Sequence, residues 1–197
     1  MLEFNQLENN HQEYEIKDGY RYLMGAQPQF PWHRVIWNPL TVAKHQFTMW
    51  LLVHEKLRTK DNLQFMQVSP LCVLCSGVDE SCRHLFFECS WSKQLLQLAA
   101  NWVGVDVMHF KFQNWLRWLR YGFKEKWRRQ VVTAMVAACA YGVWSERNNR
   151  IFRQQQFQPH QTFRLLQAEL GTKLVFSKWA KASGPNNFLI DRIRAAI

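Results

Sequence analysis

Apolar residues recur at helical spacing along most of the chain, and runs of alternating polarity are scarce. The segment 43–58 illustrates this pattern, because its large side chains return about once per helical turn. These side chains are Phe47, Trp50, Leu51 and Leu57. They predict an amphipathic helix over 43–58, and the fold class predicted for the whole chain is mainly α.

Helix signals continue on both sides of this segment. Thr59 is a candidate cap for a short helix that runs to Leu63. A longer helix is expected over 90–104, with Ser90 as its N-cap and Gly104 as its terminator. Further helices are predicted over 112–122, from about 124 to 153, and from near 160 to 181.

The longest apolar run, residues 131–144, is too short to span a bilayer and is typical of a buried helix. The first ten residues, MLEFNQLENN, have neither the basic start and apolar run of a secretory signal nor the character of a transit peptide. We therefore expect an intracellular protein in a reducing compartment, nucleus or cytoplasm, without a membrane partner.

Positive charge is concentrated toward the C-terminus. Residues 1–16 carry four Glu and no Lys or Arg, and residues 17–109 are nearly balanced. Residues 110–197 hold sixteen basic and four acidic side chains, a surplus of +12 within a chain of net charge +10. A surplus of this kind suits an anionic partner such as nucleic acid or an acidic protein surface.

Four of the five cysteines fall within CVLCSGVDESCRHLFFEC, residues 72–89. In a reducing compartment, clustered cysteines bind metal more often than they form disulfides. Cys72 and Cys75 have the C-x2-C spacing of two thiolates that take adjacent corners of a zinc tetrahedron. His84 and Cys89 complete a C-x2-C-x8-H-x4-C set with no open position, which predicts one structural zinc.

Spacing alone leaves a second set open, because Cys82 could replace His84 in a four-cysteine site. The His84 set carries a geometric condition. Residues five apart on an ideal helix point about 140° away from each other, so a helix that carries His84 must end or distort before Cys89. Leu85, Phe86 and Phe87 would then pack a small apolar core beside the metal.

A larger ordered pattern surrounds the cysteines. It contains DGY, the Trp37 region, FTMWLL, HEKLRTKDNL, CVLC and HLFFEC, in that order. This order resembles the reverse transcriptase zinc-binding domain of plant LINE-type non-LTR retroelement proteins. Residues 140–152, AYGVWSERNNRIF, are similar to a helix that often follows this domain.

The resemblance implies that Cys72, Cys75, His84 and Cys89 are the ligands and that Cys82 is not. It implies a small zinc-stabilised CCHC module followed by a helical C-terminal bundle. We divide the chain into an acidic polar arm (1–13), a zinc-binding-like domain (14–104) and a basic helical region (105–197). Polymerase, endonuclease and ribonuclease H motifs are absent from the sequence, so we expect no enzyme, and either a retroelement fragment or a copy recruited by the host.

Basic residues bracket the apolar middle of the helix predicted over 124–153. Cations at a helix N-terminus are repelled by the positive end of the helix macrodipole, and a bound anion would relieve that repulsion. The candidate phosphate contacts at the two ends are Lys124, Lys126, Arg128, Arg129, Arg147, Arg150 and Arg153. The alternative is that these are solvated basic ends of an ordinary surface helix.

Two function classes follow from these features. The first is a non-catalytic zinc-binding module that binds RNA or DNA through its basic helices. The second is a structural or protein-interaction subunit recruited into a larger ribonucleoprotein assembly. A product without a selected role is a third possibility.

The aromatic, histidine and cysteine residues outside the metal site can be interpreted from their spacing and neighbours. Trp115 and Trp118 lie between arginines and could stack on bases, but their helical spacing favours a core stripe. His45 and His54 are interpreted as surface residues of an amphipathic helix, and Cys139 as a small buried residue.

Overall fold

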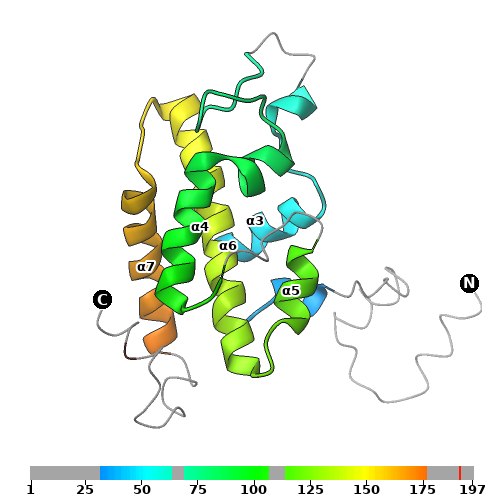
Figure 1. Ribbon diagram of the computed structural model, residues 1–197, viewed down its shortest axis with the longest axis vertical. Helices are drawn as coiled ribbons and strands as arrows, with labels where there is room; N and C mark the ends of the chain where they lie inside the picture. The colour runs from blue at the N-terminus through cyan, green and yellow to red at the C-terminus, as the bar shows by residue number, and fades with distance from the viewer. Residues whose placement is uncertain (1–31, 64–68, 107–113, 177–190, 192–197) are drawn as a thin grey trace, which may run out of the picture. The chain divides into compact units, whose positions relative to one another are not determined.

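Three long helices lie side by side, and a fourth packs against one of them (Figure 1). The three are α4 (Ser90–Val103), α6 (Lys126–Asn148) and α7 (Pro159–Val175), and the fourth is α3 (Ala43–Val53). The computed structural model describes residues 32–63, 69–106, 114–176 and 191. All of these belong to one compact unit, Trp32–Ile197.

Short helical segments connect or flank the long helices. They are α2 (His33–Ile36), η2 (Lys60–Leu63), η3 (His84–Glu88), α5 (Trp115–Tyr121) and η5 (Asn149–Arg153). Within the described ranges no strand forms, and the β-structure is one isolated antiparallel bridge between Leu71 and Asp79. The prediction of a mainly α fold with a helical C-terminal region is confirmed.

Helix α6 is the centre of the core because its middle turns are apolar and small. Residues 131–140 are all buried, and α3, α4 and α7 each pack against this helix. Gly142 permits the closest approach of α7, since a Cβ there would lie 2.8 Å from Leu166 Cδ1 and 3.1 Å from Thr162 Cγ2. Cys139 is buried as predicted, and burial raises the pKa of its thiol to about 12.

Several predicted helix ends match the structure and others shift by a few residues. Gly104 ends α4 with a φ of 66°, in the left-handed region that favours glycine. Cys89, rather than Ser90, is the N-cap residue of α4. The long predicted helix over 124–153 is present as α6 followed directly by the π-helical turn η5.

The amphipathic helix predicted over 43–58 forms as α3, but it is shorter than predicted and one residue of its expected apolar face is exposed. The helix ends at Val53 instead of 58, and Phe47, one of the four expected core residues, is 56% exposed. The fully buried residues of the helix are His45, Thr48, Met49 and Leu52, while Trp50 and Leu51 are partly buried against the core. Phe47 stacks on Trp50, with ring centroids 6.0 Å apart, instead of entering the core.

His45 is a second correction, because it is fully buried rather than on the surface. Its ring lies 4.8 Å from the ring of Tyr141 on α6, and its Nε2 is 3.5 Å from a carboxylate oxygen of Glu169 on α7. Burial lowers the pKa of His45 to about 4, against the opposing attraction of Glu169. The imidazole is therefore neutral near neutral pH.

The tryptophans of α5 belong to the core, as their helical spacing predicted. Trp115 is buried and its ring lies 5.7 Å from that of Phe87, and Trp118 is half-buried against Phe123. Three predictions lie outside the described residues: the acidic arm 1–13, the entry segment 14–31, and the end of the last helix beyond 176. Among the described helices, none is both long and apolar enough to cross a membrane.

Candidate metal centre

Cys72 and Cys75 lie in a tight turn closed by a short antiparallel pairing. The amide of Cys72 donates to the carbonyl of Val78, and the amide of Glu80 donates to Pro70, both at 2.8 Å. Within the turn, the amide of Ser76 donates to the carbonyl of Cys72 at 2.8 Å, and Ser76 has a φ of 57°. The pairing presents both cysteine side chains from one loop.

His84 and Cys89 come from the turn that leads into α4. Residues His84–Glu88 form a π-helical turn, and the amide of Cys89 donates to the carbonyl of His84 at 2.7 Å. A π-helical turn has an i→i+5 hydrogen bond and more residues per turn than an α-helix. It therefore brings the side chains of His84 and Cys89 toward the same side, whereas an ideal α-helix would turn them apart. The condition derived from the sequence, a distortion between His84 and Cys89, is met in this form.

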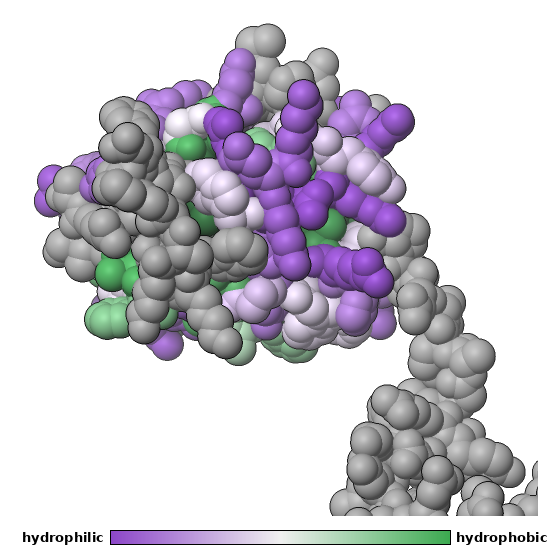
Figure 2. All heavy atoms as spheres, turned by 90° about the horizontal axis from the view of Figure 1, so that it is seen from below, coloured by the Kyte–Doolittle hydropathy of each residue, from purple (hydrophilic) through white to green (hydrophobic). Residues whose placement is uncertain are grey.

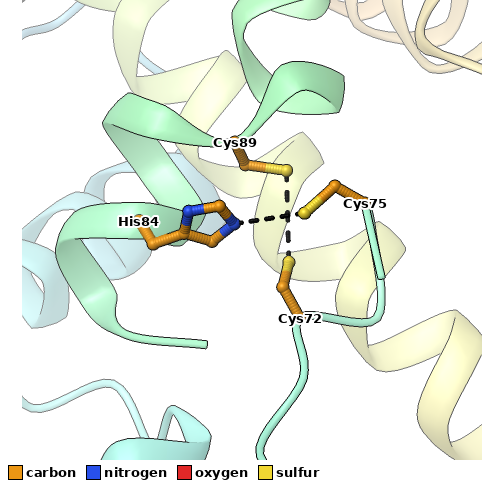
Figure 3. A group of neighbouring side chains, drawn as sticks. All are labelled: Cys72, Cys75, His84 and Cys89. Carbon is orange, nitrogen blue, oxygen red and sulfur yellow. Dashed lines mark hydrogen bonds between the residues drawn. The ribbon is translucent and has the colours of Figure 1, made fainter. Parts of the chain in front are cut away.

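The four side chains converge on one point, as Figure 3 shows. Their ligand atoms all lie within 4.8 Å of one another. The Sγ atoms of Cys72 and Cys89 are 4.0 Å apart, and Cys75 Sγ is 3.3 Å from His84 Nε2. A zinc tetrahedron with standard bond lengths has edges of about 3.8 Å between sulfurs and about 3.6 Å between sulfur and nitrogen.

Without a metal, Cys72 Sγ donates a hydrogen bond to Cys89 Sγ, and a bound divalent cation would take the place of that proton. The hydrogen bond that Cys72 donates lowers the pKa of the Cys89 thiol to about 5, and the amides of Ser92 and Trp91 act in the same direction. The same bond and burial raise the pKa of Cys72, while the backbone amides of Cys75 and Leu74 oppose that rise. Zinc stabilises neighbouring thiolates together, because its charge offsets their mutual repulsion.

Cys82 lies outside this group, although spacing alone allowed it as a ligand. It is half-buried, and burial, followed by the charges of Glu55 and Asp61, raises the pKa of its thiol to about 12. The structure therefore brings together the set that contains His84.

The apolar residues between His84 and Cys89 support the centre from one side. Leu85, Phe86 and Phe87 are buried, as expected from the sequence. Ser81 Oγ accepts the His84 amide at 3.0 Å, and Ser92 Oγ donates to the Leu85 carbonyl at 2.6 Å. The turn is thus fixed by packing and by hydrogen bonds at both ends.

Three thiolates and one imidazole, close enough for a tetrahedron and largely shielded from water, fit zinc in a closed structural site. The fold and the centre define a helical zinc-binding module. Residues 14–95 match the model of a family described as zinc-binding in reverse transcriptase. No curated protein and no solved structure matches the chain significantly.

The family match contains all four ligand positions and ends within α4. It supports the resemblance drawn from the sequence at the level of the zinc-binding domain. The helices α5, α6 and α7, which supply much of the hydrophobic core, lie beyond the matched residues.

Two arginines near the end of α6 reach into the matched region. Arg147 is buried, and its Nη2 and Nε lie 2.8 Å and 3.1 Å from Oε1 of the buried Glu80. The same oxygen accepts the backbone amide of Lys60 at 3.0 Å. One carboxylate therefore joins the cysteine loop to η2 and to α6.

Arg150 makes an equally specific set of contacts. Its Nη1 donates to the carbonyls of Val73 at 2.9 Å and Leu74 at 3.1 Å, the two residues between the first two cysteines. Its Nε donates to Glu146 Oε1 at 2.7 Å, and this oxygen also accepts the amide of Phe157 at 2.9 Å. The π-helical turn η5 contains Arg150 and ends at Arg153.

These contacts correct the interpretation of Arg147 and Arg150 as phosphate contacts. Both guanidinium groups are bound to protein acceptors, and the side chain of Arg147 is only 5% exposed. Arg153 is exposed, and its predicted phosphate contact stays a prediction. Two sequence features could have indicated this structural role. Glu80 is an acidic residue between the metal ligands, and Arg147 and Arg150 are three residues apart on a largely apolar helix.

The other end of α6 differs in that its cations face solvent. Lys124, Lys126 and Arg128 are exposed, and Arg129 is half-buried with Nη1 3.4 Å from the carbonyl of Arg120. Figure 2 looks onto the end of the bundle where α6 begins and shows hydrophilic side chains gathered there. Arg117 adds another exposed cation, and Glu125 is the only acidic residue in the described segment 114–130.

Proposed function

We propose that this chain is a non-catalytic zinc-binding module that binds RNA or DNA through the basic end of its helical bundle. One structural zinc per chain would hold the cysteine loop and the start of α4 together. Its thiolates require a reducing compartment, nucleus or cytoplasm. An origin in a plant LINE-type retroelement, as a fragment or a recruited copy, belongs to the same proposal.

The observation that carries nucleic-acid binding is the basic end: the exposed residues Arg117, Lys124, Lys126 and Arg128 with the half-buried Arg120 and Arg129. In the described part of the chain, no ion pair joins Lys124, Lys126 or Arg128 to a carboxylate. Arg128 instead reaches the carbonyl of Gly104 at 3.2 Å. Closely spaced, solvent-exposed cations are the electrostatic footprint that phosphate recognition requires.

The test is a salt titration of binding to labelled RNA and DNA oligonucleotides by the zinc-loaded full chain. Each phosphate contact contributes about 0.9 to the slope of log K against log salt, so Lys126→Glu with Arg128→Glu should reduce that slope by about two. Arg58→Glu with Arg164→Glu is the matched control, because both residues are exposed, lie elsewhere and change the net charge equally. Absence of binding at low salt, or equal effects of the two double variants, would refute the proposal.

A second candidate function is that of a structural or protein-interaction subunit in a larger ribonucleoprotein assembly. It is favoured by large apolar side chains that face solvent, among them Phe152 at 74% and Leu165 at 65% exposure. Affinity purification with and without nuclease separates the two functions. Protein partners that remain in stoichiometric amounts after nuclease treatment favour the second.

A further inference from the structure

Three peptide units join Cys72 to Cys75, and the last two of them face different partners on their two sides. Backbone hydrogen bonds reach the sulfur of Cys72 from the amides of Leu74 and Cys75. The carbonyls of the same two peptide units belong to Val73 and Leu74. In a trans peptide unit the N–H and C=O point in opposite directions, so these carbonyls face away from the sulfur.

Both carbonyls meet a single group, the Nη1 of Arg150, at 2.9 Å and 3.1 Å. Two further contacts fix the Arg150 guanidinium. Its Nε donates to Glu146, and its Cζ lies over the ring of Trp91, 5.9 Å from the ring centroid. Only 12% of the Arg150 side chain is exposed. A fixed, partly buried cation therefore determines the orientation of both peptide units.

We propose that Arg150 is a positioning residue of the metal centre, which orients the two amides that hydrogen-bond the Cys72 thiolate. Zinc with three thiolates leaves one net negative charge, and the guanidinium compensates it through the two aligned peptide dipoles. The metal-binding unit then extends from the cysteine loop to Arg150 in η5, 55 residues beyond the end of the family match at residue 95. This inference deepens the zinc-binding part of the proposed function and is independent of nucleic-acid binding.

The test measures the zinc affinity of the full chain by competition with a chromophoric chelator. Groups that support metal ligands typically contribute 10–100-fold to metal affinity, so Arg150→Gln should weaken zinc binding by about that factor. Arg150→Lys should lie between, because an ammonium can reach the carbonyls but cannot also keep the bond to Glu146. The control is Arg164→Gln, an exposed arginine of α7, which should stay within about twofold of the wild type.

A spectroscopic readout separates positioning from general stability. In the cobalt-substituted chain, Arg150→Gln should shift the thiolate-to-cobalt charge-transfer band, because the hydrogen bonds to the Cys72 sulfur are released. An unchanged band, or zinc affinity within twofold of the wild type, would overturn the inference. If Arg150→Gln does not fold, the band and affinity of Arg150→Lys decide by the same criteria, whereas a wild-type chain that binds no zinc refutes the proposed function itself.

Discussion

The two ends of α6 carry arginines of similar density in sequence but opposite use in the structure. At the end near the cysteines, Arg147 and Arg150 point inward and bind Glu80, Glu146 and two loop carbonyls. At the start of the helix, Lys126 and Arg128 face solvent next to other cations. By composition, both ends are simply basic. Only the buried acceptors around an arginine distinguish a structural arginine from one that is available to a ligand.

The largest expected effect in this comparison is the loss of the metal itself. His84→Ala should abolish tight zinc binding and unfold the end of the bundle near the cysteines, because structural zinc contributes about 10–16 kcal/mol of apparent binding free energy in small zinc modules. Cys82→Ser should retain the metal. Elemental analysis and circular dichroism with and without chelator measure both, and the reverse pattern would contradict the ligand set.

Arg147→Ala should be the most destabilising of the arginine substitutions. It leaves Glu80, whose side chain is fully buried, without its counter-charge, and breaking a buried ion pair costs about 3–5 kcal/mol of unfolding free energy. Urea denaturation of the zinc-loaded chain measures this loss. Arg164→Ala on the surface of α7 is the control and should change the unfolding free energy by less than about 0.5 kcal/mol.

A pH-dependent contribution belongs to neither end of α6 and comes from His45 on α3. Burial, followed by the charges of Lys44 and Lys173, lowers the pKa of His45 from 6.5 to about 4, against the opposing attraction of Glu169. A group whose folded pKa is lowered binds fewer protons in the folded state, so the contribution of His45 is present above pH 6.5 and is lost as the pH falls to 4. The loss is on the order of 3 kcal/mol.

His45→Gln should flatten the stability profile between pH 6.5 and 4, relative to the wild type. Denaturation with urea at a series of pH values measures it, and the zinc thiolates contribute acid sensitivity equally to both chains. His54→Gln serves as the matched control, since this residue is only half-buried. A profile as steep in His45→Gln as in the wild type would show that burial does not hold His45 neutral.

The smallest stability effect is expected at the basic end. Lys126→Glu with Arg128→Glu replaces two exposed cations in the first turn of α6 by acids, which the helix macrodipole favours by about 0.3–1 kcal/mol each. The unfolding free energy should therefore stay the same or rise slightly. A loss above about 1 kcal/mol in urea denaturation would mean that these cations, like Arg147, have a structural role.

Local signals predicted much of the fold and the centre. Gly104 ends a helix for a backbone reason, and the C-x2-C spacing of Cys72 and Cys75 reflects the geometry of one tight turn, so both are readable from a few adjacent residues. The choice between His84 and Cys82, by contrast, depended on resemblance until the structure placed the side chains.

The failures all involve contacts between distant segments. The inward face of α3 is set by packing against α6, which spacing within 43–58 does not contain. Likewise Glu80 and Arg147 are separated by 67 residues, so the pairing that removes Arg147 from solvent leaves no local pattern. Charge runs in a sequence are therefore ambiguous until the buried acceptors around them are known.

The hydrogen bonds between Arg150 and the cysteine loop form late in synthesis, because Arg150 follows all four metal ligands in the chain. Arg150 follows Cys89, the last of the four ligands, by 61 residues, which a ribosome adds in roughly 3–12 s at about 5–20 residues per second. During this interval all four ligands of the centre have been synthesised, but the residue that orients the loop between the first two has not. Metal captured early is held by a loop whose carbonyls still face water, and the final coordination strength is reached only when η5 has been synthesised.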